Sequence, residues 1–275
     1  MMKEIKFYKM EGAGNDFIVI DNRIYKFSLE QIIEITPKLC DRRFGIGGDG
    51  MLILEPAQKP EVDYTMIYRN ADGSDAGMCG NGARCLSLFA YKYGFGATQT
   101  FNVHNNVYEA EVHKDHSVSV HFPVQVTPSK LNLDGIDLIK ANAATEHLIT
   151  FLPEEELDNE DKLVQIGRKL RYHESVNPPG TNVNFVSYDK PDSIYLQTYE
   201  RGVENLTLAC GTGALASAIA AHYHQGKGER HTSCNVHVKG GTLNATFDFE
   251  AKTKTYHQLI LTGPAHFVFQ GIFSV

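Results

Sequence analysis

The sequence predicts a mixed α and β protein built from two similar halves. Cys79 and Cys210 each open a glycine-rich turn, and each turn leads into apolar residues at helical spacing. Alternating apolar and polar stretches, typical of half-buried strands, lie on both sides of these turns. Pro123 and Pro128 interrupt the pattern near the middle of the chain, where we expect a crossover between the halves. The shared order of strands, Cys-Gly-x-Gly turn, helix and strands indicates an internal repeat.

The first half has short predicted strands and one helix before its cysteine. Ser28 is a suitable N-cap for a helix that ends before Asp41, and we expect Pro37 to kink this helix or limit its start. Two glycine-rich loops separate the strands, but neither has the form of a phosphate-binding or dinucleotide-binding loop. The predicted strands cover residues 5–10, 17–20 and 51–54.

Both cysteine turns lead into predicted helices, which Gly94 and Gly226 are expected to end. The second helix is so rich in alanine that we expect other elements to pack against it on several sides. The apolar spacing i, i+3, i+4, i+7 is made by Leu86, Phe89, Ala90 and Tyr93 in the first helix and by Leu215, Ala218, Ile219 and His222 in the second. Further strands are predicted at 118–122, 182–186 and 195–199, and a surface helix is predicted to start at 158–161.

Composition excludes several classes of function. The chain has 275 residues, 42% of them hydrophobic, which is enough for one large domain or two smaller ones. Lys and Arg total 26 and Asp and Glu total 33, and the resulting net charge of -7 argues against a nucleic-acid partner. Residues 1–6 are too charged for a signal peptide, and no apolar run is long enough to span a membrane. We therefore expect a cytoplasmic protein with no membrane partner.

The five cysteines are an odd number and include no Cys-x-x-Cys pair. This argues against a disulfide framework and a structural zinc site, so we expect reduced thiols. Cysteine is often a buried packing residue, which is our interpretation of Cys40, Cys85 and Cys234. Cys79 and Cys210 could also serve only in packing, but their matched positions at helix starts favour a chemical role.

Two thiols at helix starts suit the inversion of an amino-acid α-carbon. The free N–H groups and the dipole of a helix start favour a thiolate and also a bound carboxylate. Inversion requires that a proton be removed from one face and another be delivered to the opposite face, which one thiolate and one thiol can do together. Glu200 could assist thiol deprotonation and Arg201 could pair with a substrate carboxylate; the alternative is an ordinary surface ion pair.

Several motifs, read in order, resemble those of diaminopimelate epimerase. They run from residue 9 to residue 213, and Gly263-Pro264-Ala265 resembles the closing segment of that family. The motifs are Lys-Met-Glu-Gly-Ala-Gly-Asn-Asp-Phe at 9–17, Arg-Phe-Gly-Ile-Gly at 43–47, Asn-Ala-Asp-Gly-Ser at 70–74, Cys-Gly-Asn-Gly-Ala-Arg-Cys at 79–85, Glu-Arg-Gly at 200–202 and Cys-Gly-Thr-Gly at 210–213.

The resemblance implies a two-base epimerase, independent of metal and cofactor, that interconverts LL- and meso-2,6-diaminopimelate in lysine and peptidoglycan synthesis. It also implies an α/β (α+β) fold of two pseudo-symmetric domains, each with mostly antiparallel strands around a central helix and with the site in the cleft between them. The domains would cover residues 1–122, with 265–275 returning to the first, and residues 123–264. A homodimer is a further implication.

By motif position, the resemblance assigns Cys79 and Cys210 as the acid and base thiols, and Glu200 and His147 as further catalytic residues. The implied substrate-binding residues are Asn15, Asn70, Gly80, Asn81, Asn182, Glu200, Arg201, Gly211 and Thr212.

The chain departs from the family pattern in two places. Thr145-Glu146-His147 stands where many members have Asn-Pro-His, so only the histidine is retained, and a surface histidine at a strand edge is the alternative interpretation. Gly50 stands where some members have glutamine, so any substrate contact there comes from the backbone or is absent.

Other functions remain open at this point. A racemase of the same fold that acts on histidine, proline, hydroxyproline or several amino acids is one alternative, and a non-catalytic thiol redox or binding protein is another. Proline and hydroxyproline racemases tend to have histidine after the first Cys-Gly, whereas this chain has Asn81.

Overall fold

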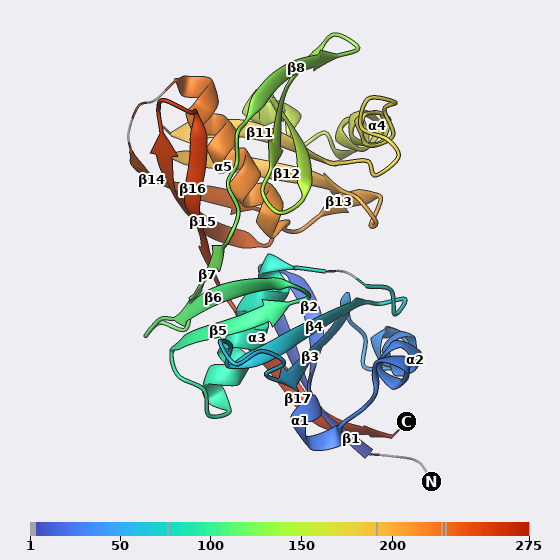
Figure 1. Ribbon diagram of the computed structural model, residues 1–275. Coiled ribbons are helices and arrows are strands. Elements are labelled where there is room, and N and C mark those ends of the chain that lie inside the picture. The colour runs from blue at the N-terminus through green and yellow to red at the C-terminus, as the bar shows by residue number, and fades with distance from the viewer. Residues whose placement is uncertain (1–3, 76, 191, 227, 229, 275) are drawn as a thin grey trace. The chain divides into compact units, whose positions relative to one another are not determined.

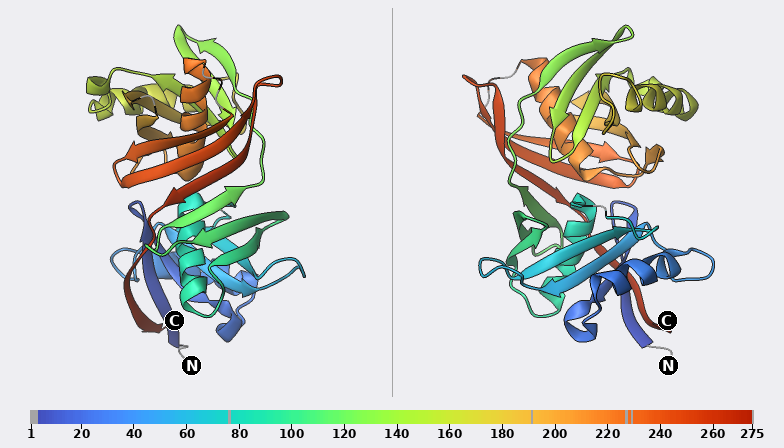
Figure 2. Two further views of the ribbon diagram at one scale, coloured as in Figure 1. Left: turned by 90° about the vertical axis from the view of Figure 1, so that its left-hand side faces the viewer. Right: turned by 45° about the vertical axis from the view of Figure 1, so that its right-hand side comes forward.

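A computed structural model of the chain describes residues 4–75, 77–190, 192–226, 228 and 230–274. Residues 1–3 of the charged N-terminal segment and residue 275, the last of the predicted first domain, lie outside the described residues. The chain forms two compact units: unit 1 consists of residues 1–120 and 263–275, and unit 2 of residues 121–262. Both ends of the described chain belong to unit 1, where the first and last strands run side by side (Figure 1, Figure 2).

Unit 1 contains a sheet in the strand order β17-β1-β2-β3-β4-β5-β6 (Figure 1). Its pairs are antiparallel except for β2–β3 and β4–β5, which are parallel. The strands are β1 (Glu4–Gly12), β2 (Asn15–Asp21), β3 (Gly50–Pro56), β4 (Tyr64–Asn70), β5 (Thr98–Val103), β6 (Asn106–Val112) and β17 (His266–Ser274), and the boundary of the unit falls within β7 (Val118–Phe122). The helices are α1 (Asn22–Tyr25), α2 (Leu29–Cys40) and α3 (Gly80–Lys92).

Unit 2 contains strands in the order β8-β9-β10-β11-β12-β14-β15-β16. Its parallel pairs are β10–β11 and β12–β14, and short β13 pairs with β12. The strands are β8 (Ser129–Leu133), β9 (Ile136–Asn142), β10 (Glu146–Phe151), β11 (Asn182–Lys190), β12 (Ser193–Glu200), β13 (Asn205–Thr207), β14 (His231–Val238), β15 (Gly241–Glu250) and β16 (Thr255–Gly263). The helices are α4 (Glu160–Arg171), α5 (Gly211–Gln225) and the 3-10 helix η1 (Glu154–Glu156).

The two units repeat one pattern of strand directions, which confirms the internal repeat predicted from the cysteine turns. From β17 to β6, and again from β8 to β15, the successive pairs are antiparallel, antiparallel, parallel, antiparallel, parallel and antiparallel. Helices α2 and α4 make the first parallel crossover of each unit, and α3 and α5 make the second. A residue of unit 1 therefore has a counterpart in unit 2.

The central strands of each sheet are covered on both faces. In unit 1, Ile18 and Ile20 of β2 pack against α2 in one apolar cluster, so the alternating residues Phe17 and Val19 face α3. In unit 2, Val183 and Phe185 of β11 pack in a cluster with α4, so the residues between them face α5. The cysteine helices are thus buried, as predicted for the alanine-rich one: α5 is buried from Gly211 to His222.

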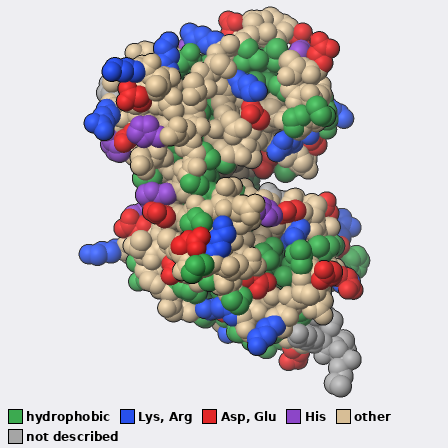
Figure 3. Space-filling model, viewed as in Figure 1, with side chains coloured by type: hydrophobic (Ala, Val, Ile, Leu, Met, Phe, Trp, Pro, Cys, Tyr) green, Lys and Arg blue, Asp and Glu red, His purple; other side chains and the backbone are tan. Residues whose placement is uncertain are grey.

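Local signals behaved largely as the sequence predicts. Ser28 caps α2 in a reciprocal capping box with Gln31, and Gly226 ends α5 in a left-handed conformation. Pro37 neither limits the start of α2 nor ends the helix, because it lies in the last turn, and the helix continues to Cys40. No helix among the described residues is long and apolar enough to cross a membrane. Lys, Arg, Asp and Glu side chains are intermixed on the face seen in Figure 3.

Candidate active site

Cys79 and Cys210 occupy the same position in their units, the N-cap of the buried helix. Their backbone angles are nearly equal, with φ -121° and ψ 117° at Cys79 and φ -119° and ψ 112° at Cys210. The first N–H groups of each helix have no partner within the helix, and they surround the cysteine with positive partial charge. Both thiols therefore have the setting that favours a thiolate.

The predicted site residues of each unit lie together at one end of adjacent strands in the sheet. In unit 1, Asn15 begins β2 and Asn70 ends β4, and Gly50, where some family members have glutamine, begins β3 between them. In unit 2, His147, Asn182 and Glu200 lie at the start of β10, the start of β11 and the end of β12. Gly50 is the counterpart of Asn182, because each belongs to the first residue pair of the first parallel ladder in its unit. Gly50 pairs there with Phe17, and Asn182 pairs with His147. Each cluster adjoins its own cysteine helix.

Asn15 lies beside the first thiol. Its Oδ1 is 3.8 Å from Cys79 Sγ and 3.4 Å from Asn81 Nδ2, while its Nδ2 donates to Asp49 Oδ2 at 2.6 Å. The Cys79 sulfur also accepts a hydrogen bond from the Gly82 N–H at 3.4 Å. Asp49 therefore sets the orientation of the Asn15 amide and directs its oxygen toward the thiol.

Asp49 belongs to the glycine-rich loop before β3 and is held there by a network of ion pairs. Arg42 bridges Asp16 Oδ1 at 2.6 Å and Asp49 Oδ1 at 2.7 Å, and Lys9 binds Asp16 Oδ2 at 2.6 Å. Burial alone would raise the pKa of Asp16, but the bonds from Arg42 and Lys9 outweigh it and hold the pKa at about 2. This network fixes the loop behind Asn15.

Asn81 connects the helix start to a buried cation. Its Oδ1 accepts from Arg84 Nη2 at 2.8 Å, and Arg84 Nε donates to the Pro264 carbonyl at 3.2 Å. Arg84 has no exposed surface, and its Nη1 has no hydrogen-bond partner among the described residues. Burial lowers the pKa of Arg84, and the nearby thiols of Cys85 and Cys79 act in the opposite direction. A positive charge therefore lies behind the Cys79 helix start.

Asn70 and Gly50 complete the edge of unit 1. The Asn70 amide donates to Ser74 Oγ at 3.0 Å. A Cβ atom at Gly50 would lie 2.4 Å from the Arg69 carbonyl oxygen and 2.5 Å from the Tyr68 ring. The Arg69 carbonyl and the Tyr68 ring thus occupy the place that a side chain at position 50 would need.

His147 is fully buried, so the alternative of a surface histidine at a strand edge is wrong. Its Nε2 lies 3.0 Å from Thr212 Oγ1 and 2.9 Å from Thr145 Oγ1, and Thr212 Oγ1 lies 3.7 Å from Cys210 Sγ. Burial, and then the charge of Arg201, lowers the pKa of His147 to about 3, so the ring is neutral at physiological pH.

Asn182 ties the unit 2 cluster together. Its Oδ1 accepts from the Arg201 backbone N–H at 2.8 Å, and its Nδ2 lies 3.4 Å from Thr145 Oγ1. The Arg201 guanidinium donates to the Pro179 carbonyl at 3.2 Å. Glu200 ends β12 and is half-buried, next to Arg201. The helix start contributes Gly211 and Thr212, both buried.

The remaining cysteines are at most 5% exposed. Cys40, Cys85 and Cys234 are buried, and burial raises the pKa of Cys40 to about 12 and that of Cys85 further. Cys40 and Cys85 therefore stay protonated, and the burial of all three cysteines agrees with a role in packing. Among the described residues, no cluster of His, Cys, Asp and Glu side chains is arranged to hold a metal ion.

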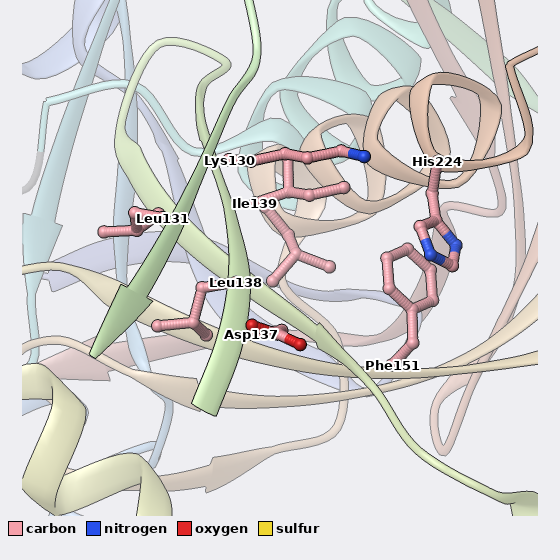
Figure 4. A pocket seen from close by; sticks show the side chains of 8 residues that line it. Lys130, Leu131, Asp137, Leu138, Ile139, Phe151 and His224 are labelled. Carbon is pink, nitrogen blue, oxygen red and sulfur yellow. The ribbon is translucent and has the colours of Figure 1, made fainter. Parts of the chain in front are cut away.

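A cavity in unit 2 lies away from the cysteine. It has a volume of about 380 Å³, and Lys130, Asp137, Phe151 and His224 are among its lining residues (Figure 4). None of the predicted site residues lines it. The cavity therefore does not coincide with either cluster.

Four contributors were missed by the sequence analysis. Asp49 orients Asn15, and Arg84 holds Asn81. Asn184 and Thr198 lie behind His147, with Asn184 Nδ2 at 2.9 Å from His147 Nδ1 and Thr198 Oγ1 at 2.8 Å from Asn184 Oδ1. The alternation of β11 could have indicated Asn184, because it lies two residues after Asn182 on the same face of the strand.

Comparison with known proteins identifies the family. The family model for diaminopimelate epimerase matches residues 7–123 and 140–268. The chain is 38% identical to a diaminopimelate epimerase of Flavobacterium psychrophilum, over 97% of this chain and 99% of the relative. It is 39% identical to the enzyme of Chlorobaculum tepidum, over 97% of this chain and 100% of the relative.

Solved structures share the fold at low sequence identity. A phenazine biosynthesis protein of the PhzF family from Bacillus anthracis matches with a TM-score of 0.76 and 12% identity, with 100% of both chains covered. A hydroxyproline epimerase from Agrobacterium vitis matches with a TM-score of 0.74 and 14% identity, with 99% of this chain and 93% of that chain covered. These likenesses confirm the predicted mixed α and β fold with mostly antiparallel strands. Together with the full-length relatives and the family match, they place this chain in the diaminopimelate epimerase family, with the isomerase activity of that family.

Proposed function

We propose that Cys79 and Cys210 are the two bases with which this chain interconverts LL- and meso-2,6-diaminopimelate. The observation that carries the proposal is the equivalence of the two cysteines: each caps the central helix of its unit with the same backbone geometry. A reaction that inverts one carbon needs two similar acid–base groups, and a repeated unit supplies them.

The proposed reaction moves two protons. One cysteine, as thiolate, takes the α-proton, so the C–H bond breaks and an S–H bond forms. The other cysteine, as thiol, delivers its proton to the opposite face. The N–H groups at Gly80-Asn81 and Gly211-Thr212 are proposed to hold the α-carboxylate and to stabilise the negative charge that develops on it during deprotonation.

The other polar residues are proposed to recognise the substrate. Diaminopimelate carries two ammonium and two carboxylate groups, which suit amides, a guanidinium and a carboxylate in fixed positions. Asn15, Asn70, Asn182, Glu200 and Arg201 have these groups at the sheet edges that carry the cysteines. Glu200 also remains a proposed catalytic residue, and His147 is proposed to act through Thr212, because its Nε2 is 3.0 Å from that hydroxyl.

A stereospecific assay in deuterated water tests the proposal. The protein should epimerise LL-diaminopimelate and incorporate deuterium at the α-carbon, with much slower or no reaction on histidine, proline or lysine. Faster turnover of one of those amino acids would overturn the substrate assignment. Full epimerisation by Cys79→Ala or Cys210→Ala would overturn the two-base assignment.

We also propose that the protein is a cytoplasmic homodimer. Strand β17 exposes Val268, Phe269 and Ile272, which are 55%, 49% and 66% exposed, and a second copy could cover them. Sedimentation equilibrium should give twice the mass of one chain, and Ile272→Glu should give the monomer. A monomeric wild type would contradict this proposal, and recovery in the membrane fraction would contradict the location.

A further inference from the structure

A chain of hydrogen bonds runs through the interior of unit 2 and ends at Cys210. It consists of Thr198, Asn184, His147, Thr212 and Cys210, from strands β12, β11 and β10 to the start of α5. Thr198, Asn184 and His147 are at most 3% exposed. In unit 1, the register places Leu52 at the position of Asn184. Leucine has no hydrogen-bonding group, so unit 1 cannot form the same series of hydrogen bonds.

The atoms of Asn184 give the hydrogen-bond chain a direction. Its Oδ1 faces the Thr198 hydroxyl at 2.8 Å, and its Nδ2 faces His147 Nδ1 at 2.9 Å. An amide nitrogen can only donate, so Nδ1 of the imidazole must accept. Because the buried ring is neutral, its single proton is then on Nε2.

The Nε2 proton determines what the Thr212 hydroxyl can do. Nε2 lies 3.0 Å from Thr212 Oγ1 and 2.9 Å from Thr145 Oγ1, and the two hydroxyl oxygens lie 2.9 Å apart. With Nε2 as a donor, these oxygens accept from the ring directly or through each other. The Thr212 hydroxyl proton is then available to Cys210 Sγ, 3.7 Å away. A hydroxyl that donates to sulfur stabilises the thiolate.

We propose that Asn184 is a positioning residue for Cys210: it fixes His147 as the Nε2–H tautomer, so that Thr212 donates its hydroxyl proton to the sulfur. Thr198 supports this role, because its hydroxyl donates to Asn184 Oδ1 and leaves Nδ2 to face His147. Thr145 takes part as a second acceptor for the ring, with its Oγ1 2.9 Å from Nε2. The inference rests on the proposed function of Cys210 as an acid–base thiol.

The tautomer can be measured directly. Protein labelled with ¹⁵N-histidine gives separate ring signals for the two tautomers, and the signals absent from His147→Gln identify His147. We expect a protonated Nε2 and an unprotonated Nδ1 at neutral pH in the wild type. An Nδ1–H tautomer or an imidazolium would overturn the proposal, whatever the activity of the enzyme.

A matched substitution tests the consequence for sulfur. Asn184→Leu gives unit 2 the residue that unit 1 carries at Leu52 and leaves His147 Nδ1 without its donor. In a Cys79→Ala background, alkylation of Cys210 by iodoacetamide should become about tenfold slower, because a hydrogen bond to a charged group is lost. In the wild-type background, kcat should fall about tenfold with little change in KM.

A control and a milder variant keep the test decisive. Thr150→Val removes a buried hydroxyl of β10 outside the hydrogen-bond chain and should leave alkylation and kcat unchanged. Thr198→Val is the milder variant and serves if Asn184→Leu does not fold. It should slow the alkylation of Cys210 and lower kcat, each by a smaller factor than expected for Asn184→Leu. An unchanged rate of Cys210 alkylation in folded Asn184→Leu or Thr198→Val would overturn the proposed role of Asn184. A correct tautomer with slower alkylation, in a protein without epimerase activity, would contradict the proposed function alone.

Discussion

Unit 1 and unit 2 have the same backbone beneath their cysteines but different side chains. The residues Phe17, Leu52 and Tyr68 of unit 1 correspond in register to His147, Asn184 and Thr198 of unit 2. In unit 1 this layer is aromatic and aliphatic, with Phe17 and Tyr68 in edge contact at 5.7 Å between ring centres. In unit 2 it is a buried polar network that reaches the sulfur through Thr212.

The support of the two thiols therefore comes from different sources. Behind Cys79 lies the buried cation Arg84, connected through Asn81 and Asn15. Behind Cys210 lies the neutral imidazole of His147. The repeat thus gives both cysteines the same backbone geometry. The side chains beneath them differ between the units and give each thiol a different electrostatic environment. This combination fits the two bases proposed above, which occupy equivalent positions while one is protonated and the other is not.

Removal of either thiol should have the largest effect. Cys79→Ala and Cys210→Ala should each lower the rate of epimerisation by about 10³-fold, because neither unit can supply both the acid and the base. The measurement is a stereospecific assay of product, with circular dichroism to confirm folding. Cys234→Ala, in unit 2, is the matched control and should retain activity, since that thiol is a buried packing residue. A large loss from one alanine variant only would mean that the two units are not equivalent.

The buried imidazole should give unit 2 a dependence of stability on pH. Burial holds the pKa of folded His147 at about 3, against 6.5 in the unfolded chain. The unfolded state therefore binds the proton first, and this stabilisation is complete above about pH 6.5 and is lost as the pH falls toward 3. From about pH 7 to about pH 5, the loss for such a group is about 2 kcal/mol.

Urea denaturation of the wild type and of His147→Gln at both pH values tests this dependence. The variant should lose less of its free energy of unfolding on acidification, and the difference between the proteins isolates the histidine from all other titrating groups. An equal loss in the two proteins would show that His147 is accessible to protons in the folded state.

Arg84 should act on the thiol of unit 1 alone. Arg84→Met removes the positive charge behind Cys79, so alkylation of Cys79 should become about tenfold slower while that of Cys210 is unchanged. Peptide mass spectrometry can follow both cysteines in one reaction. Arg84→Lys keeps the charge and should lie closer to the wild type. Equal slowing of both cysteines would indicate a general disturbance of the fold.

The smallest effect should come from a methyl group added at equivalent glycines. A Cβ at Gly82 would lie 2.8 Å from Leu52 Cδ2, and a Cβ at Gly213 would lie 2.8 Å from Asn184 Oδ1 and 3.2 Å from Cys210 Sγ. Gly82→Ala and Gly213→Ala should each cost about 1 kcal/mol of stability, because both overpack. Only Gly213→Ala should also lower kcat, by about fivefold, because it displaces Asn184. A larger loss of kcat in Gly82→Ala would reverse the comparison.

Much of the fold could be predicted from local patterns, and most residues of the candidate site from the motifs of the family. The cysteines, the helices that follow them and the flanking strands are specified by short-range spacing, which the structure preserves. Asn184 and Arg84 could not be assigned roles in this way. Their roles depend on which strand and which turn pack behind the helix start, and these neighbours are distant in sequence: Arg84 reaches Pro264, and Asn184 reaches His147.

The sequence by itself determined the repeat, the two thiols and the family, because each is encoded in contiguous motifs with fixed spacing. Tertiary structure decided the chemical state of the residues around the thiols. His147 shows why: from the sequence it could be catalytic or a surface residue, and its full burial among Asn184, Thr145 and Thr212 makes it a neutral hydrogen-bond donor. Desolvation and the direction of buried hydrogen bonds set its protonation, and both arise only when β10, β11 and α5 pack together.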